Sequence, residues 1–148
     1  MPTITSRRDV TASPEEVWRL VGDPHHFPRW WPRVDRVEDV KEGRFTEVLI
    51  GARSGRAVRA DFRIKDKRKE RLLRFTQDIE GSPFEKVLKE AETRIELEPA
   101  GEGTKVTIAL RQRPRGMARF GGGTMMRRAT GRILDAALDG LEAAVGQT

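Results

Sequence analysis

The feature that most constrains this chain is an amphipathic stretch at residues 124–148, which follows three consecutive glycines at 121–123. At about 100° per residue, its apolar side chains fall in one wide arc and its charged side chains in the opposite one. The apolar arc holds Met126, Ala129, Ile133, Leu134, Ala137, Leu138 and Leu141. A helix of this length is on the order of 30 Å long, and its apolar face needs a partner. Because the segments before it are typical of strands, we predict a long helix over a sheet, enclosing a space for a small apolar molecule.

The rest of the chain predicts a strand, two short helices and six further strands. Ser13 with Glu16 forms a capping box and Pro14 suits the first helical position, so a helix should begin at Pro14. A second short helix should cover residues 25–30. Period-two alternation then indicates strands, and with the first strand they occupy residues 4–10, 34–40, 44–50, 58–65, 73–79, 87–97 and 106–112.

Short turns between consecutive strands favour an antiparallel meander with one covered face. The predicted fold class is therefore α+β: a curved antiparallel β-sheet wrapped around a long C-terminal α-helix, with two short helices after the first strand. A chain of 148 residues fits one domain, and we expect it to span residues 1–148.

Composition limits the classes of function. The absence of cysteine excludes a disulfide framework and a thiolate metal site. No run of about 18 apolar residues and no signal-peptide pattern occurs, so we expect a cytoplasmic protein without membrane insertion. The net charge is +6, but Lys and Arg are spread along the chain among 23 acidic residues. We interpret this charge as a solvated surface and expect no specific nucleic-acid partner.

A run of residues near the N-terminus carries a family resemblance. Residues 12–18 read Ala-Ser-Pro-Glu-Glu-Val-Trp, followed by Asp23-Pro24 and then Trp30-Trp31-Pro32. With the order of elements, this resembles the START-like or SRPBCC superfamily, the helix-grip fold shared with the birch pollen allergen, and most closely its polyketide cyclase/dehydrase branch. The resemblance covers nearly the whole chain. It implies a pocket for a lipid-like or polyketide-like molecule, in a superfamily of carriers, receptors, aromatases and cyclases.

The inward rows of the predicted strands are apolar apart from Gln77, Thr93 and Gln112. A buried amide without a partner costs about 1–3 kcal/mol, so each should bond to a side chain, a water or a ligand, unless it lies at an open strand end. The resemblance places the Trp30-Trp31 pair near the cavity mouth, and adjacent side chains point apart, so we expect one in the core and one at the mouth. The predicted ligand-binding residues are Trp30, Trp31, Phe62, Phe75, Gln77, Thr93, Gln112, Met117, Phe120, Met126 and Ile133.

Catalytic chemistry is less well marked. His25 and His26 are adjacent and point apart, which favours a surface pair over a metal site. No metal-ligand spacing or phosphate loop occurs, so we expect no cofactor and no metal. The resemblance implies an arginine, a hydroxyl residue and a tyrosine or tryptophan around a cyclase pocket. The chain has no tyrosine, Ser54 and Arg56 lie in a predicted turn, and Arg59 should point outward, so no catalytic residue is assigned.

Three functions follow as hypotheses. The first is binding of a small hydrophobic molecule, the second is polyketide cyclase or aromatase activity, and the third is an interaction module that uses the basic segment from Arg113 to Arg119 on an acidic protein or nucleic acid. The three glycines form either a hinge that lets the segment before them open the pocket or a static connection. The sequence predicts no oligomeric state and names no ligand.

Overall fold

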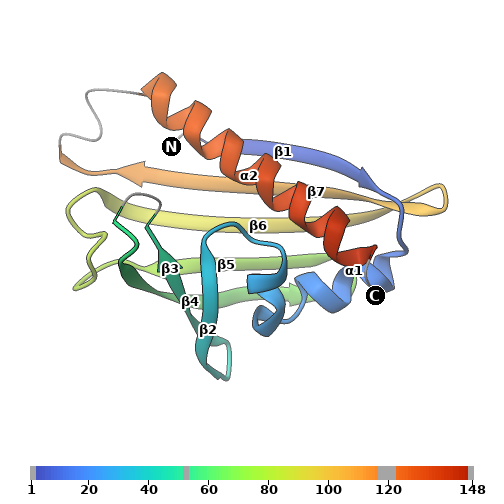
Figure 1. Ribbon diagram of the computed structural model, residues 1–148, viewed down its shortest axis with the longest axis horizontal. Helices are drawn as coiled ribbons and strands as arrows, with labels where there is room; N and C mark the ends of the chain where they lie inside the picture. Colours follow the sequence, from blue (N-terminus) through green and yellow to red (C-terminus); the bar gives the residue numbers. More distant parts are fainter. Residues whose placement is uncertain (1–2, 52–53, 117–122, 147–148) are drawn as a thin grey trace.

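The computed structural model describes residues 3–51, 54–116 and 123–146, and Figure 1 shows a curved sheet with a long helix lying across it. The elements in chain order are β1 (Thr3–Val10), α1 (Pro14–Val21), the 3-10 helix η1 (Pro24–Arg29), β2 (Val34–Lys41), β3 (Arg44–Ile50), β4 (Ala57–Arg68), β5 (Leu72–Asp78), β6 (Leu88–Ala100), β7 (Gly103–Pro114) and α2 (Gly123–Val145). The predicted α+β class and order are confirmed, although β4, β6 and β7 are longer than predicted.

All seven strands form one antiparallel sheet in the order β1-β7-β6-β5-β4-β3-β2. Strands β2 to β7 follow each other as a meander, and β1 pairs with β7 and forms the edge of the sheet. The long strands β6 and β7 pair from Leu88↔Pro114 to Ala100↔Gly103, which carries the sheet past both ends of α2. The predicted meander is thereby confirmed.

The first short helix begins where the sequence signals predict, whereas the second begins at Pro24, one residue earlier than predicted. The Ser13 side chain accepts a hydrogen bond from the Glu16 amide at 3.2 Å, and Pro14 is the first residue of α1. Asp23 caps η1 by accepting from the His25 amide at 3.0 Å. Each cap satisfies an amide that a helix start leaves unpaired. Together α1 and η1 close one end of the concave side of the sheet (Figure 1).

The hydrophobic core lies against the C-terminal half of α2, next to α1. Four α2 side chains there are completely buried, namely Leu134, Ala137, Leu138 and Leu141. Phe27 of η1 packs edge-on against Phe45 of β3 with ring centroids 5.5 Å apart. The first turns of α2 are more exposed: Ala129 is exposed and Thr130 is buried, so the predicted apolar arc is wrong at Ala129. The helix therefore covers the sheet tightly along one half only.

Candidate ligand-binding cavity

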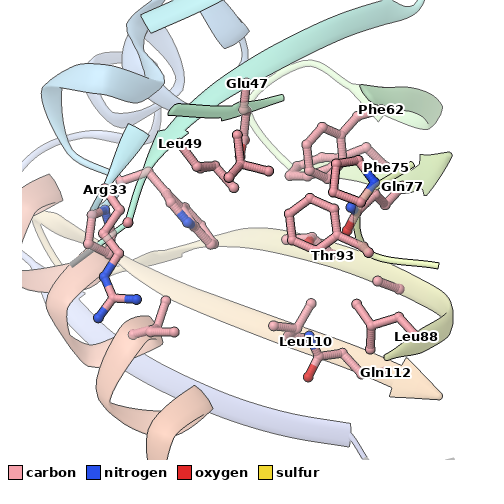
Figure 2. A pocket seen from close by; sticks show the side chains of 18 of the residues that line it. Arg33, Glu47, Leu49, Phe62, Phe75, Gln77, Leu88, Thr93, Leu110 and Gln112 are labelled. Carbon is pink, nitrogen blue, oxygen red and sulfur yellow. The ribbon is translucent and has the colours of Figure 1, made fainter. Parts of the chain in front are cut away.

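A cavity of about 530 Å³ lies where the core ends, between the concave face of the sheet and α2 (Figure 2). Strands β3 to β7 supply most of its wall, Ile133 of α2 covers it, and residues 31–33 border one side. The predicted cavity between sheet and helix is confirmed. Its position follows from the alternation of the strands, because only the inward rows can face α2.

The wall is predominantly apolar and aromatic. Phe62 of β4 and Phe75 of β5 meet edge-on with ring centroids 5.4 Å apart, and Phe62 also stacks on Phe45 at 5.1 Å. Leu49, Leu110 and Ile133 complete the apolar surface around them. Aromatic rings in this arrangement hold each other in place, so they form a wall of defined shape.

Three neutral polar side chains interrupt this surface, and they are the three that the sequence predicts. Thr93 pairs with Phe75 on one side and Leu110 on the other, and Gln112 pairs with Ala91. Gln77 pairs with Phe62. The Gln77 Nε2 atom is fully buried, and nothing in the described part of the chain accepts its hydrogen bonds. A buried donor without a partner is costly, which makes Gln77 a candidate contact for a ligand.

Glu47 is the main feature that the sequence reasoning missed. It lies on β3 between Val37 of β2 and Ala60 of β4, lines the cavity, and is only 5% exposed. No hydrogen bond or ion pair reaches its carboxyl group from residues 3–51, 54–116 or 123–146. Burial raises the pKa of Glu47 to about 8, because the charged form loses its hydration. One signal in the sequence could have indicated its position. Glu47 is two residues from both Phe45 and Leu49, so the three side chains lie on the same face of the strand.

The predicted site residues that the structure describes fall into two groups, those that line the cavity and those that do not. Those that line the cavity are Trp31, Phe62, Phe75, Gln77, Thr93, Gln112 and Ile133. Trp30 and Met126 are not among the lining residues. Trp30 is 3% exposed, and its indole N–H donates to the Leu20 carbonyl at 3.2 Å, so it belongs to the core, whereas Trp31 is half-buried and lines the cavity. Met126 lies on α2 about two turns before Ile133. It is Ile133 that lines the cavity.

Several predictions lie outside the described residues. They concern Met117, Phe120, the last part of the basic segment up to Arg119, and the first two glycines of the proposed hinge. Gly123 is the first residue of α2. Arg113 belongs to β7, which ends one residue later.

Other side chains considered for chemistry are outside the cavity. The Asp23 carboxylate accepts a hydrogen bond from Nδ1 of the His25 ring at 2.8 Å, on the surface. Ser54 and Arg56 are exposed and do not line the cavity, and Arg59 pairs with Glu38 and Asp39. Within the described ranges, no cluster of three potential metal-binding side chains occurs. None of the described helices is long and apolar enough to cross a membrane.

A curved antiparallel sheet gripping a long C-terminal helix around an apolar cavity defines a helix-grip domain of the START-like or SRPBCC type. The chain belongs to the family described as polyketide cyclase/dehydrase and lipid transport, whose model matches residues 1–146. The resemblance seen in the sequence is thereby confirmed. Family and fold together indicate a domain that binds hydrophobic ligands.

Solved structures share this fold at low sequence identity. A START superfamily protein from Mycobacterium smegmatis is 16% identical, with a TM-score of 0.81 over 98% of this chain and 97% of that one. A conserved protein from Geobacillus kaustophilus is 14% identical, with a TM-score of 0.81 over 99% and 96%. Ara h 8.0201 is 14% identical, with a TM-score of 0.76 over 99% of both chains. No curated protein matches the chain.

Proposed function

We propose that the cavity binds one small, mainly apolar molecule that carries a polar group. The observation that supports this most directly is an apolar cavity of about 530 Å³ whose wall contains Gln77, with an amide nitrogen that no described residue hydrogen-bonds. Small-ligand sites usually measure roughly 300–1,000 Å³, with an apolar lining and a few polar groups that orient the ligand. Burying a ligand here removes apolar surface from water, at roughly 25 cal/mol per Å².

Filling the cavity with a side chain tests this function. Ala91 lines the cavity and is buried, so Ala91→Phe places a ring in the space that the ligand would occupy. We expect the dissociation constant for an apolar fluorescent probe to rise at least about tenfold. Ala136→Phe is the matched control, because Ala136 is exposed on α2 and does not line the cavity. Equal probe binding by both variants would contradict the proposal.

Native mass spectrometry of the protein purified from its own host gives a complementary test. Wild-type protein is expected to retain a small molecule that Ala91→Phe does not retain. The mass of that molecule would identify the ligand class.

The two cavity glutamines are expected to affect binding differently. Gln77→Leu should stabilise the empty protein by about 1–3 kcal/mol, because it removes a buried donor that has no partner. Gln112→Leu should not, because the Gln112 amide is not among the buried polar groups without a partner. Both variants should remain folded and alter ligand selectivity. Urea unfolding and probe titrations measure the two effects, and unchanged selectivity in both variants would exclude an orienting role.

Cyclisation of a poly-ketone is a second candidate function, and Glu47 is the observation in its favour. A group with a pKa of about 8 titrates close to neutral pH, where general acid–base catalysis is most effective. Incubation with a linear poly-β-ketone should then yield ring products with wild-type protein but not with Glu47→Gln. If wild-type protein forms them no faster than buffer does, the domain binds without catalysing this reaction.

A further inference from the structure

Two hydrogen-bonding groups that find no partner among the described residues border the same cavity, Glu47 on β3 and Gln77 on β5 (Figure 2). Strand β4 lies between them. Ala60 on β4 pairs with Glu47, and Phe62, two residues further on the same face, pairs with Gln77. The two polar groups therefore lie on one concave surface, separated by the inward row of β4, and both line the cavity that a ligand would occupy.

The surroundings of Glu47 favour its protonated form. The other ionisable side chain that lines the cavity is Arg33, which is exposed and makes no ion pair with Glu47. On β2 and β4, which flank Glu47, the neighbouring charged side chains bond to each other or to Thr46, and none of them lines the cavity; they are Arg36, Glu38, Arg59 and Asp61. Burial is the cause of the raised pKa of Glu47, so at neutral pH its carboxyl group carries a proton.

A carboxyl group kept neutral by an apolar site can donate a hydrogen bond. The Glu47 hydroxyl then joins the Gln77 amide as a hydrogen-bond donor in the cavity wall. An ammonium ligand offers donors only, so it could pair with ionised Glu47 but would leave Gln77 Nε2 without an acceptor. A carboxylate ligand could accept from both donors, but it would lose its own hydration, and Arg33, the cationic side chain among the lining residues, is exposed and lies across the cavity from Gln77 (Figure 2). An uncharged carbonyl oxygen can accept from a donor of either kind and has no charge to desolvate.

We propose that Glu47 and Gln77 form a subsite for an uncharged carbonyl group on an otherwise apolar ligand, such as a ketone, ester or quinone. This subsite selects against ligands that end in a carboxylate or an ammonium group. The inference rests on the proposed binding function, and it names the chemical group that the cavity recognises.

Four probes of matched shape test the subsite: 2-acetylnaphthalene, 2-isopropylnaphthalene, 2-naphthoate and 2-naphthylmethylamine. Their dissociation constants are measured by competition with an apolar fluorescent dye at about pH 6 and about pH 9.5. Wild-type protein is expected to bind the ketone at about pH 6 roughly tenfold more tightly than the hydrocarbon, and more tightly than either charged probe. The preference for the ketone should decrease at the higher pH, as Glu47 loses the proton that it donates.

Substitutions distinguish the role of Glu47 as a hydrogen-bond donor from the effect of its ionisation. Glu47→Gln keeps a donor that does not ionise, so the ketone preference should persist at both pH values. Glu47→Leu and Gln77→Leu each remove a donor, so the ratio of ketone affinity to hydrocarbon affinity should fall severalfold in each variant. A ketone preference that survives in both leucine variants would overturn the subsite, as would wild-type protein that binds naphthoate as tightly as the ketone.

The outcomes also distinguish this inference from the function on which it depends. If wild-type protein binds the hydrocarbon without preferring the ketone, the cavity is a binding site but the subsite is wrong. If it binds none of the four probes, the proposed binding function fails and the subsite fails with it. The carbon-13 NMR titration of the Glu47 carboxyl group needs no ligand: a midpoint near the ordinary glutamate value would overturn the protonated donor directly.

Discussion

Replacing Glu47 with glutamine should raise the free energy of unfolding at pH 8 by several kcal/mol and leave it almost unchanged near pH 4. The pKa of Glu47 is raised from its ordinary value of 4.5 to about 8 in the folded protein. Between these values the folded protein holds a proton that the unfolded chain has released. The stability contributed by this proton is complete below about pH 4.5 and is lost as the pH rises to about 8.

The expected slope is a loss of roughly 1.4 kcal/mol for each pH unit in this window, and the total is on the order of 5 kcal/mol. Urea unfolding of both proteins at several pH values measures it, because the contributions of all other titrating groups cancel in the difference. A difference that does not change with pH would show that Glu47 is ionised in the folded protein. A ligand that bonds to protonated Glu47 should extend the stable range to higher pH.

Replacing Gly140 with alanine should destabilise the protein by about 1–3 kcal/mol through overpacking, although alanine favours the helix by about 1 kcal/mol. Gly140 lies on α2 directly against the backbone of Trp30, and a methyl group there would overlap the Trp30 carbonyl oxygen. The helix or the chain at Trp30 must then move. Because residues 31–33 border the cavity, probe affinity should change as well.

Gly131 provides the matched control on the same helix. Apart from the adjacent residues and the nearby backbone of α2 itself, a methyl group on Gly131 would meet no described atom within 4 Å, so Gly131→Ala should gain the helix propensity alone and stabilise the protein by about 1 kcal/mol. Thermal and urea unfolding of the two variants should therefore shift in opposite directions. Stabilisation by both substitutions would show that α2 does not depend on the close approach at Gly140.

The sequence predicted the architecture because its signals are local. The capping box at Ser13 and the period of two between residues 34 and 112 predicted the elements and their order, and short turns predicted the antiparallel meander. Alternation also identified Gln77, Thr93 and Gln112 as inward polar residues. It could assign them to one face because their strands carry apolar side chains on one row and charged side chains on the other.

What only the tertiary structure decided was where groups from distant elements meet. On β3 the row of Phe45, Glu47 and Leu49 alternates with a row that also holds apolar side chains, so the pattern does not say which row faces inward, and a glutamate is normally exposed. Glu47 is buried because β2 and β4 flank it and its side chain lines the cavity. In the sequence nothing distinguishes Gly140 from another helical glycine, and only the structure shows that the backbone of Trp30 lies against it. The sequence by itself determined the elements and, where an apolar row alternates with a charged one, the face that points inward, whereas the protonated carboxyl group and the close contact depend on packing between segments far apart in the chain.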